Sequence, residues 1–95
     1  MVYRLIIKPR AENDLAEAIT WYESRKSGLG KLFLDQVEKY LNYIRRNPFQ
    51  YPSKRRPYRE AFIKMFPYLI IYEVVENEVI VYSVFNTYRD PCDKP

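Results

Sequence analysis

The segment PYLIIYEV at residues 67–74, followed by VIVYSVF at residues 79–85, decides the fold of this chain. Both segments are runs of apolar, β-branched and aromatic residues, which is the composition that strands prefer. The polar residues 76–78 between them predict the turn of a hairpin. Arg-Asp-Pro follows at residues 89–91, and Pro91 cannot donate to a strand ladder, so the second strand must end before it.

Two helices are predicted upstream of this hairpin. Residues 2–7 alternate as a first strand with one well-buried face. Pro9 stands at a first helical position, and apolar residues then recur at helical spacing until Gly28. The same spacing covers residues 29–46, and Asn47 and Pro48 end this second helix because a residue before proline disfavours helical geometry. So few residues separate the two helices that we expect an antiparallel helical hairpin.

The remaining elements complete an α+β domain. Residues 48–57 contain three prolines among tyrosines and basic residues, which predicts an ordered surface loop. Residues 58–64 alternate and predict the second strand. The element order is therefore βααβββ, a small twisted antiparallel sheet with the helical hairpin packed on one face. At this length we expect one domain over residues 1–95, with a core but a thin margin of stability.

In this order the elements resemble the ParE/RelE superfamily of type II toxins, also called plasmid-stabilisation proteins. The resemblance covers nearly the whole chain and depends on the order and spacing of short motifs. These motifs are Ala11 with Asp14 and Leu15, Tyr22, Leu29 and Gly30 with Phe33, Asn47 and Pro48, Tyr58 and Arg59, the strand from Pro67 and Tyr68 to Tyr72, and Arg89, Asp90 and Pro91. The resemblance implies a toxin whose usual partner is a cognate antitoxin protein.

One branch of the superfamily is enzymatic. The resemblance implies that RelE-like members are ribosome-dependent mRNA endoribonucleases, a chemistry that needs an acid, a base and cations around the reacting phosphate. Such members place a basic residue directly after the aromatic residue of the third strand and an Arg or His just beyond the fourth. This chain has Leu69 at the first place, Asn86 and Thr87 at the second, and no histidine. A nuclease would need a rearranged site, for which the candidate residues are Arg59, Lys64 and Arg89.

The ParE-like branch matches better. The resemblance implies that its members poison DNA gyrase through protein contact, without a catalytic residue. We therefore predict a non-enzymatic toxin of a type II toxin–antitoxin pair, for which DNA gyrase is a possible target. We expect it to contact nucleic acid only indirectly, as part of the toxin–antitoxin complex. Two alternatives stay open: the RelE-like endoribonuclease, and an inert or repurposed binding domain of the same fold.

The candidate contact residues for a target or an antitoxin are Arg56, Arg59, Tyr88, Arg89 and Asp90. Guanidinium groups bind phosphates or carboxylates at two points, although a basic loop can equally be a solvated surface. Arg59 is preferred within the basic segment because a strand fixes the direction of its side chain. We expect Arg59 to approach Arg89 at one end of the sheet.

Other predictions concern packing and composition. Tyr68 and Tyr72 lie four residues apart on one strand face, and core packing is favoured over stacking on RNA bases. One cysteine and no histidine predict no internal disulfide, no metal and no cofactor, whereas the net charge of +4 is compatible with nucleic acid or an acidic protein partner and assigns neither. The first residues are too charged for a signal peptide, and no apolar stretch reaches the length of a membrane span, so we expect a cytoplasmic protein.

Overall fold

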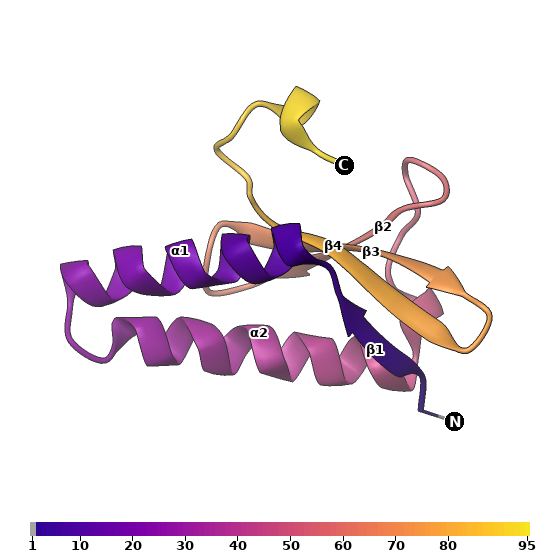
Figure 1. The fold of residues 1–95 in the computed structure, drawn as a ribbon, viewed down its shortest axis with the longest axis horizontal. Coiled ribbons are helices and arrows are strands. Elements are labelled where there is room, and N and C mark those ends of the chain that lie inside the picture. The colour runs from indigo at the N-terminus through magenta and orange to yellow at the C-terminus, as the bar shows by residue number, and fades with distance from the viewer. Residues whose placement is uncertain (1) are drawn as a thin grey trace.

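The computed structural model describes residues 2–95, and within them the elements follow the predicted order. The helices and strands are β1 (Arg4–Ile7), α1 (Pro9–Arg25), α2 (Leu29–Arg46), β2 (Arg59–Ile63), β3 (Tyr68–Val75) and β4 (Glu78–Asn86), with short 3-10 helices η1 (Pro48–Gln50) and η2 (Pro91–Asp93). The two helices run side by side in Figure 1, with α2 below α1, and the yellow segment after β4 rises above α1. No helix in the described part of the chain is long and apolar enough to cross a membrane.

The sheet is mixed, with strand order β1-β4-β3-β2. Strands β2, β3 and β4 form the predicted antiparallel meander. Strand β1, however, pairs parallel to β4, from Arg4 opposite Glu78 to Ile7 opposite Val81. The prediction of an entirely antiparallel sheet is therefore corrected at this edge. A parallel pair needs a long crossover connection, which the helical hairpin and two strands provide. No local turn signal in the sequence indicates that β1 and β4 pair.

The β3–β4 hairpin turns on two residues instead of the predicted three, because Glu78 already pairs with Val75. Glu76 takes the left-handed conformation in this turn, with φ 55. The register also shifts inside the hairpin: Ile71 lies opposite Ser83 and Tyr72 opposite Val81. Tyr82 is therefore the extra residue of a bulge, and such a residue bends the strand locally.

The helices approach each other most closely at Gly30. A β-carbon there would lie 2.8 Å from the backbone oxygen of Ile19, so only glycine fits without a shift of one helix. The carboxylate of Glu23 accepts hydrogen bonds from the backbone N–H groups of Gly28 and Gly30, at 3.0 Å each for the shorter contacts. This side chain satisfies the donors at the start of α2 that have no partner inside the helix. Helix α1 ends at Arg25, earlier than predicted, and Gly28 instead precedes α2 with φ 87.

The core lies between the helical hairpin and one face of the sheet. Tyr68 and Tyr72 belong to it, which confirms their predicted packing role. The Tyr72 hydroxyl donates to the backbone oxygen of Pro48, and burial raises the pKa of this phenol. Other fully buried side chains of the core are Phe33, Val37, Ile44, Ile63, Ile70, Val79 and Val81.

Candidate functional site

An open cleft of about 910 Å³ lies between α1 and the segment that leaves β4. One wall is the face of α1 that carries Arg10, Asn13, Asp14, Glu17 and Trp21, and the floor is formed by Ala18, Tyr22, Tyr68 and Val84. The opposite wall is formed by Pro67, Asn86, Tyr88, Arg89 and Asp93. We call this the polar cleft.

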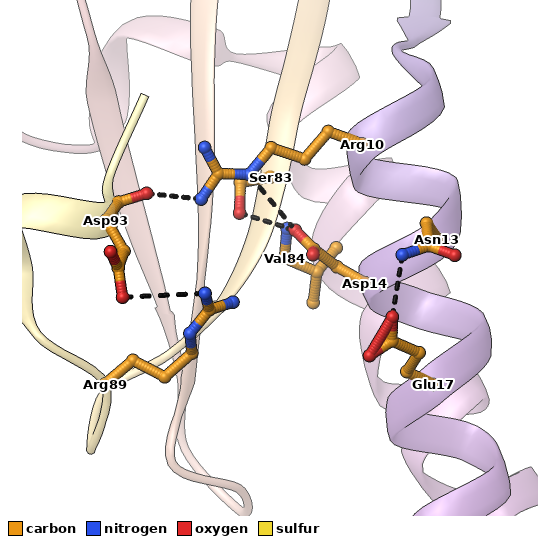
Figure 2. Close-up of polar contacts among 8 residues, drawn as sticks. All are labelled: Arg10, Asn13, Asp14, Glu17, Ser83, Val84, Arg89 and Asp93. Carbon is orange, nitrogen blue, oxygen red and sulfur yellow. Dashed lines mark hydrogen bonds and ion pairs between the residues drawn. The ribbon is translucent and has the colours of Figure 1, made fainter.

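Asp14 ties α1 to the sheet at the base of the polar cleft (Figure 2). Its side chain is only 13% exposed. One carboxylate oxygen accepts from the Ser83 hydroxyl at 2.6 Å and from the Val84 backbone N–H at 3.2 Å. Strand β1 pairs with β4 only as far as Val81, so beyond that point a helix replaces the neighbouring strand. The carboxylate supplies the acceptor that a ladder would otherwise supply, since buried N–H groups need partners.

The segment after β4 is held back against α1 by charged side chains, also drawn in Figure 2. The Arg10 guanidinium donates to the backbone oxygen of Asp93, and Arg89 forms an ion pair with the Asp93 carboxylate at 3.5 Å. Asp90 does not pair with Arg89: it accepts from the backbone N–H of Cys92 at 2.9 Å and caps η2. This hydrogen bond lowers the pKa of Asp90.

Aromatic rings form the rim and floor of the polar cleft. Trp21 is 51% exposed and Tyr88 is 87% exposed, each on its own wall. The Trp21 ring packs edge-on against Tyr22 at 5.1 Å, and the Arg25 guanidinium lies 4.6 Å from its centroid. On the floor, the Tyr68 hydroxyl accepts from the Asn86 amide at 3.3 Å. Burial raises the pKa of both Tyr22 and Tyr68, so both phenols stay neutral at physiological pH.

The polar cleft carries no excess positive charge, although the whole chain is basic. Its lining holds two arginines, Arg10 and Arg89, and three carboxylates, Asp14, Glu17 and Asp93, and the Arg25 guanidinium beside Trp21 brings the local charge to zero. The chain as a whole carries +4. Glu17 accepts a hydrogen bond from the Asn13 amide at 2.7 Å, a neutral partner.

The predicted site residues do not all meet at this place. Tyr88 and Arg89 line the polar cleft, and Asp90 follows them directly. Arg59 lies opposite Tyr72, whereas Ile63 and Asn86 both lie opposite Tyr68. Arg59 and Ile63, the two ends of β2, are four residue steps apart, which is about 13 Å. The predicted approach of Arg59 to Arg89 is therefore wrong, because they leave opposite ends of the sheet.

Arg59 instead fastens a loop to the sheet. Its guanidinium donates to the backbone oxygen of Tyr51 at 2.8 Å and lies 5.1 Å from the centroid of Phe49. Arg56 is exposed in the basic loop before β2, far along the chain from either wall of the polar cleft. A contact role for these two arginines stays a prediction.

The α1 wall of the polar cleft was missed from the sequence. Its residues recur at helical spacing, from Arg10 through Asn13, Asp14 and Glu17 to Trp21, so they share one face of α1. That polar stripe was a usable signal. What it did not show was that Ser83 and Asp93, some seventy residues later in the chain, would lie against it.

The face of the sheet away from the helices carries an apolar row where a ribonuclease would need cations. Phe62, Leu69 and Phe85 lie side by side across β2, β3 and β4. Leu69 and Phe85 are buried, and Phe62 is 58% exposed. The guanidinium of Arg89 lies over the Phe85 ring, 5.7 Å from its centroid. Within residues 2–95, no three His, Cys, Asp or Glu side chains gather as metal ligands would.

Together, the helical hairpin and the mixed sheet form the small α+β fold expected for the ParE/RelE superfamily, with a polar cleft beside α1. The family model described as "ParE toxin of type II toxin-antitoxin system, parDE" matches residues 5–91. The chain therefore belongs to the ParE toxin family of type II toxin–antitoxin systems. This confirms the resemblance and the toxin class predicted from the sequence.

Solved structures with the same fold include members of both branches. The chromosomal ParDE toxin–antitoxin system from P. aeruginosa aligns with TM-score 0.73 at 14% identity, over 90% of this chain and 96% of that one. The isolated E. coli RelE toxin aligns with TM-score 0.69 at 20% identity, over 95% of this chain and 89% of that one. At these identities the likeness concerns the fold alone. A comparison with curated proteins gave no match.

Proposed function

We propose that this protein is a cytoplasmic toxin that inhibits growth by binding a protein target, with DNA gyrase as the target to test first, and that it has no catalytic site of its own. The observation that carries the proposal is the apolar row of Phe62, Leu69 and Phe85. Cleavage of RNA by its own 2′-hydroxyl develops negative charge on the phosphate, and cations or hydrogen-bond donors must stabilise it. Apolar side chains offer neither.

The nearby cations support the same proposal because other groups already engage them. Arg89 pairs with Asp93 at 3.5 Å, and Lys94 pairs with Glu60 at 3.0 Å. The rearranged nuclease site would also require Arg59, which points to the helix side of the sheet with Ala61 and donates to a loop oxygen. These arginines therefore do not converge on one phosphate position.

For the antitoxin, we propose docking at the outer edge of β1. Arg4 and Lys8 donate their backbone N–H groups towards β4, so the polar groups of Leu5 and Ile7 between them point away from it. Beside this edge lies an apolar groove of about 490 Å³, lined by Leu5, Ile7, Leu15, Leu34, Val37, Glu38, Leu41 and Asn42. An open edge beside an apolar groove suits an extended peptide that adds a strand.

The antitoxin part is tested by thermal unfolding with and without the cognate antitoxin. At a hundredfold excess over Kd, binding to the native state adds about 2.7 kcal/mol, which raises the Tm by roughly 10 to 20 °C for a domain of this size. Leu34→Glu in the groove should abolish most of this gain, whereas Leu32→Glu, elsewhere on α2, should retain it. An unchanged Tm at saturating antitoxin would contradict the proposal.

The toxin part is tested by two assays on the purified protein. Inhibition of DNA supercoiling by gyrase is expected, and primer extension on translating ribosomes should give no site-specific cuts. Cuts in mRNA would establish the endoribonuclease instead. Growth without arrest on expression in the absence of antitoxin, with neither activity, would favour the inert binding domain.

A further inference from the structure

We propose that the polar cleft is the surface that holds the target, and that it receives a basic, extended protein segment with one apolar or aromatic side chain. This inference rests on the proposed function and deepens it. The aromatic side chain would enter between Trp21 and Tyr88, above the floor of Tyr22 and Tyr68. A lysine or arginine of the same segment would meet Glu17.

The local charge selects the class of partner. With two arginines against three carboxylates in the lining and Arg25 beside Trp21, the polar cleft has no net charge within a basic chain. At physiological salt, charges beyond roughly 8 Å are largely screened, so a segment inside the cleft experiences the local charge more than the net +4. The cleft therefore has no excess of cations for a nucleic-acid backbone or an acidic peptide, and the exposed carboxylate of Glu17 favours a basic protein segment.

Glu17 is the carboxylate available to such a segment. Asp14 already accepts from Ser83 and Val84, and Asp93 already pairs with Arg89. Within residues 2–95, Glu17 forms no salt bridge: its carboxylate accepts a hydrogen bond from the neutral Asn13 amide and is exposed at the wall. A carboxylate with capacity for further donors binds Lys or Arg by a charge-assisted hydrogen bond.

The aromatic rim supplies the binding energy. Trp, Tyr and Arg are the residues that dominate protein interfaces, particularly where they surround a pocket. Trp21 is held by Tyr22 and Arg25, so binding costs little of its side-chain freedom. The second wall is also held in place, because Arg10 of α1 donates to the backbone oxygen of Asp93 and Arg89 pairs with the Asp93 carboxylate.

A photo-cross-linker at position 88 tests the inference in cells that express the toxin without antitoxin. Tyr88→p-benzoylphenylalanine places the reactive group on the rim, and Tyr43→p-benzoylphenylalanine is the control, since Tyr43 is 40% exposed on α2 outside the cleft lining. We expect position 88 alone to give a strong cross-link, to a protein segment that mass spectrometry shows to be rich in Lys or Arg. Cross-links to nucleic acid or to an acidic segment, or equal yields at the two positions, would overturn the inference.

Charge variants add a second measurement. Glu17→Lys should lower the cross-link yield at position 88 by at least about tenfold, because like charges across an interface are strongly unfavourable. Asp35→Lys makes the same change on an exposed face of α2 and should leave the yield unchanged. If Glu17→Lys lowers the Tm, the milder variants Glu17→Gln and its control Asp35→Asn take the place of the two lysine variants. Glu17→Gln should then lower the cross-link yield about threefold, as expected for the loss of an exposed ion pair. Yields that do not respond to Glu17 overturn the inference.

The inference and the proposed function can fail separately. If the cross-linked segment is basic and depends on Glu17 but belongs to a protein other than gyrase, the cleft inference stands and the proposed target is wrong. If gyrase is inhibited while Glu17 has no influence on the cross-link or on inhibition, the proposed function stands and the cleft inference is wrong.

Discussion

Replacing Asp14 with alanine tests whether a carboxylate takes the place of a missing strand neighbour beside β4. The change removes the acceptor for the Ser83 hydroxyl and for the Val84 N–H, at 2.6 and 3.2 Å. Hydrogen bonds to a charged group contribute about 1.5 to 3 kcal/mol each, and Ser83 is fully buried, so its hydroxyl cannot turn to water. We expect Asp14→Ala to lower the free energy of unfolding by about 3 to 5 kcal/mol, a large part of the usual total.

Asp14→Asn separates the charge from the acceptor. An amide oxygen in the place of the one carboxylate oxygen that accepts both hydrogen bonds can still accept them, so only the charge is lost and the cost should be smaller, about 1 to 2 kcal/mol. The Arg10 ion pair contributes little to either value, because its atoms are 4.0 Å apart and Arg10 is largely exposed. Urea unfolding followed by circular dichroism measures each value.

A double-mutant cycle with Ser83→Ala completes the test. If the hydroxyl bonds directly to Asp14, the two alanine variants should couple by about 1 kcal/mol or more, whereas distant sites are additive. Asp35→Ala is the control for a surface carboxylate and should stay within about 0.5 kcal/mol. A cost below about 1 kcal/mol for Asp14→Ala, or full additivity with Ser83→Ala, would refute the reasoning.

Three further predictions concern other contacts. Gly30→Ala should destabilise the fold by about 1 to 3 kcal/mol, because a β-carbon would lie 2.8 Å from the Ile19 oxygen and the helices would have to separate; an unchanged urea midpoint would contradict this. The hydrogen bond to Glu73 raises the pKa of Tyr82 to about 12, so its contribution to stability is fully present below pH 10 and is lost between about pH 10 and 12. Tyr82→Phe should therefore flatten the fall of Tm with pH in this range, and an identical fall would count against it. Arg59→Ala should lower the Tm because it removes the hydrogen bond to the Tyr51 oxygen, and an unchanged Tm would contradict this.

The sequence predicted the elements well because each one carries its own local signal. The runs at residues 67–74 and 79–85 have strand composition, and the helical stripe of α2 ends at a proline. The strand boundaries moved by a residue or two, since the turn at Glu76 needs only two residues where three polar ones are present. Local composition does not show which of the polar residues 76–78 still pairs with the neighbouring strand.

The site was predicted only in part, because it is assembled from segments distant in sequence. Tyr88 and Arg89 were singled out from their place after the last strand, and both do line the polar cleft. Asp14 was noticed as part of a motif, but its role depends on β1 stopping short of Ser83. The predicted approach of Arg59 to Arg89 was wrong because the strand register decides which strand ends are neighbours. The register depends on how two strands pair, and the sequence of one strand does not show this.

Helix α1 separates the two proposed binding surfaces, and this arrangement constrains how an antitoxin could neutralise the toxin. Asp14 lines the polar cleft and Leu15, the next residue, lines the apolar groove. A peptide bound along β1 therefore contacts one side of the helix while a target segment contacts the other. Direct competition requires the antitoxin to continue around α1 into the polar cleft. A truncated antitoxin that covers the β1 edge alone should therefore stabilise the toxin without displacing the target.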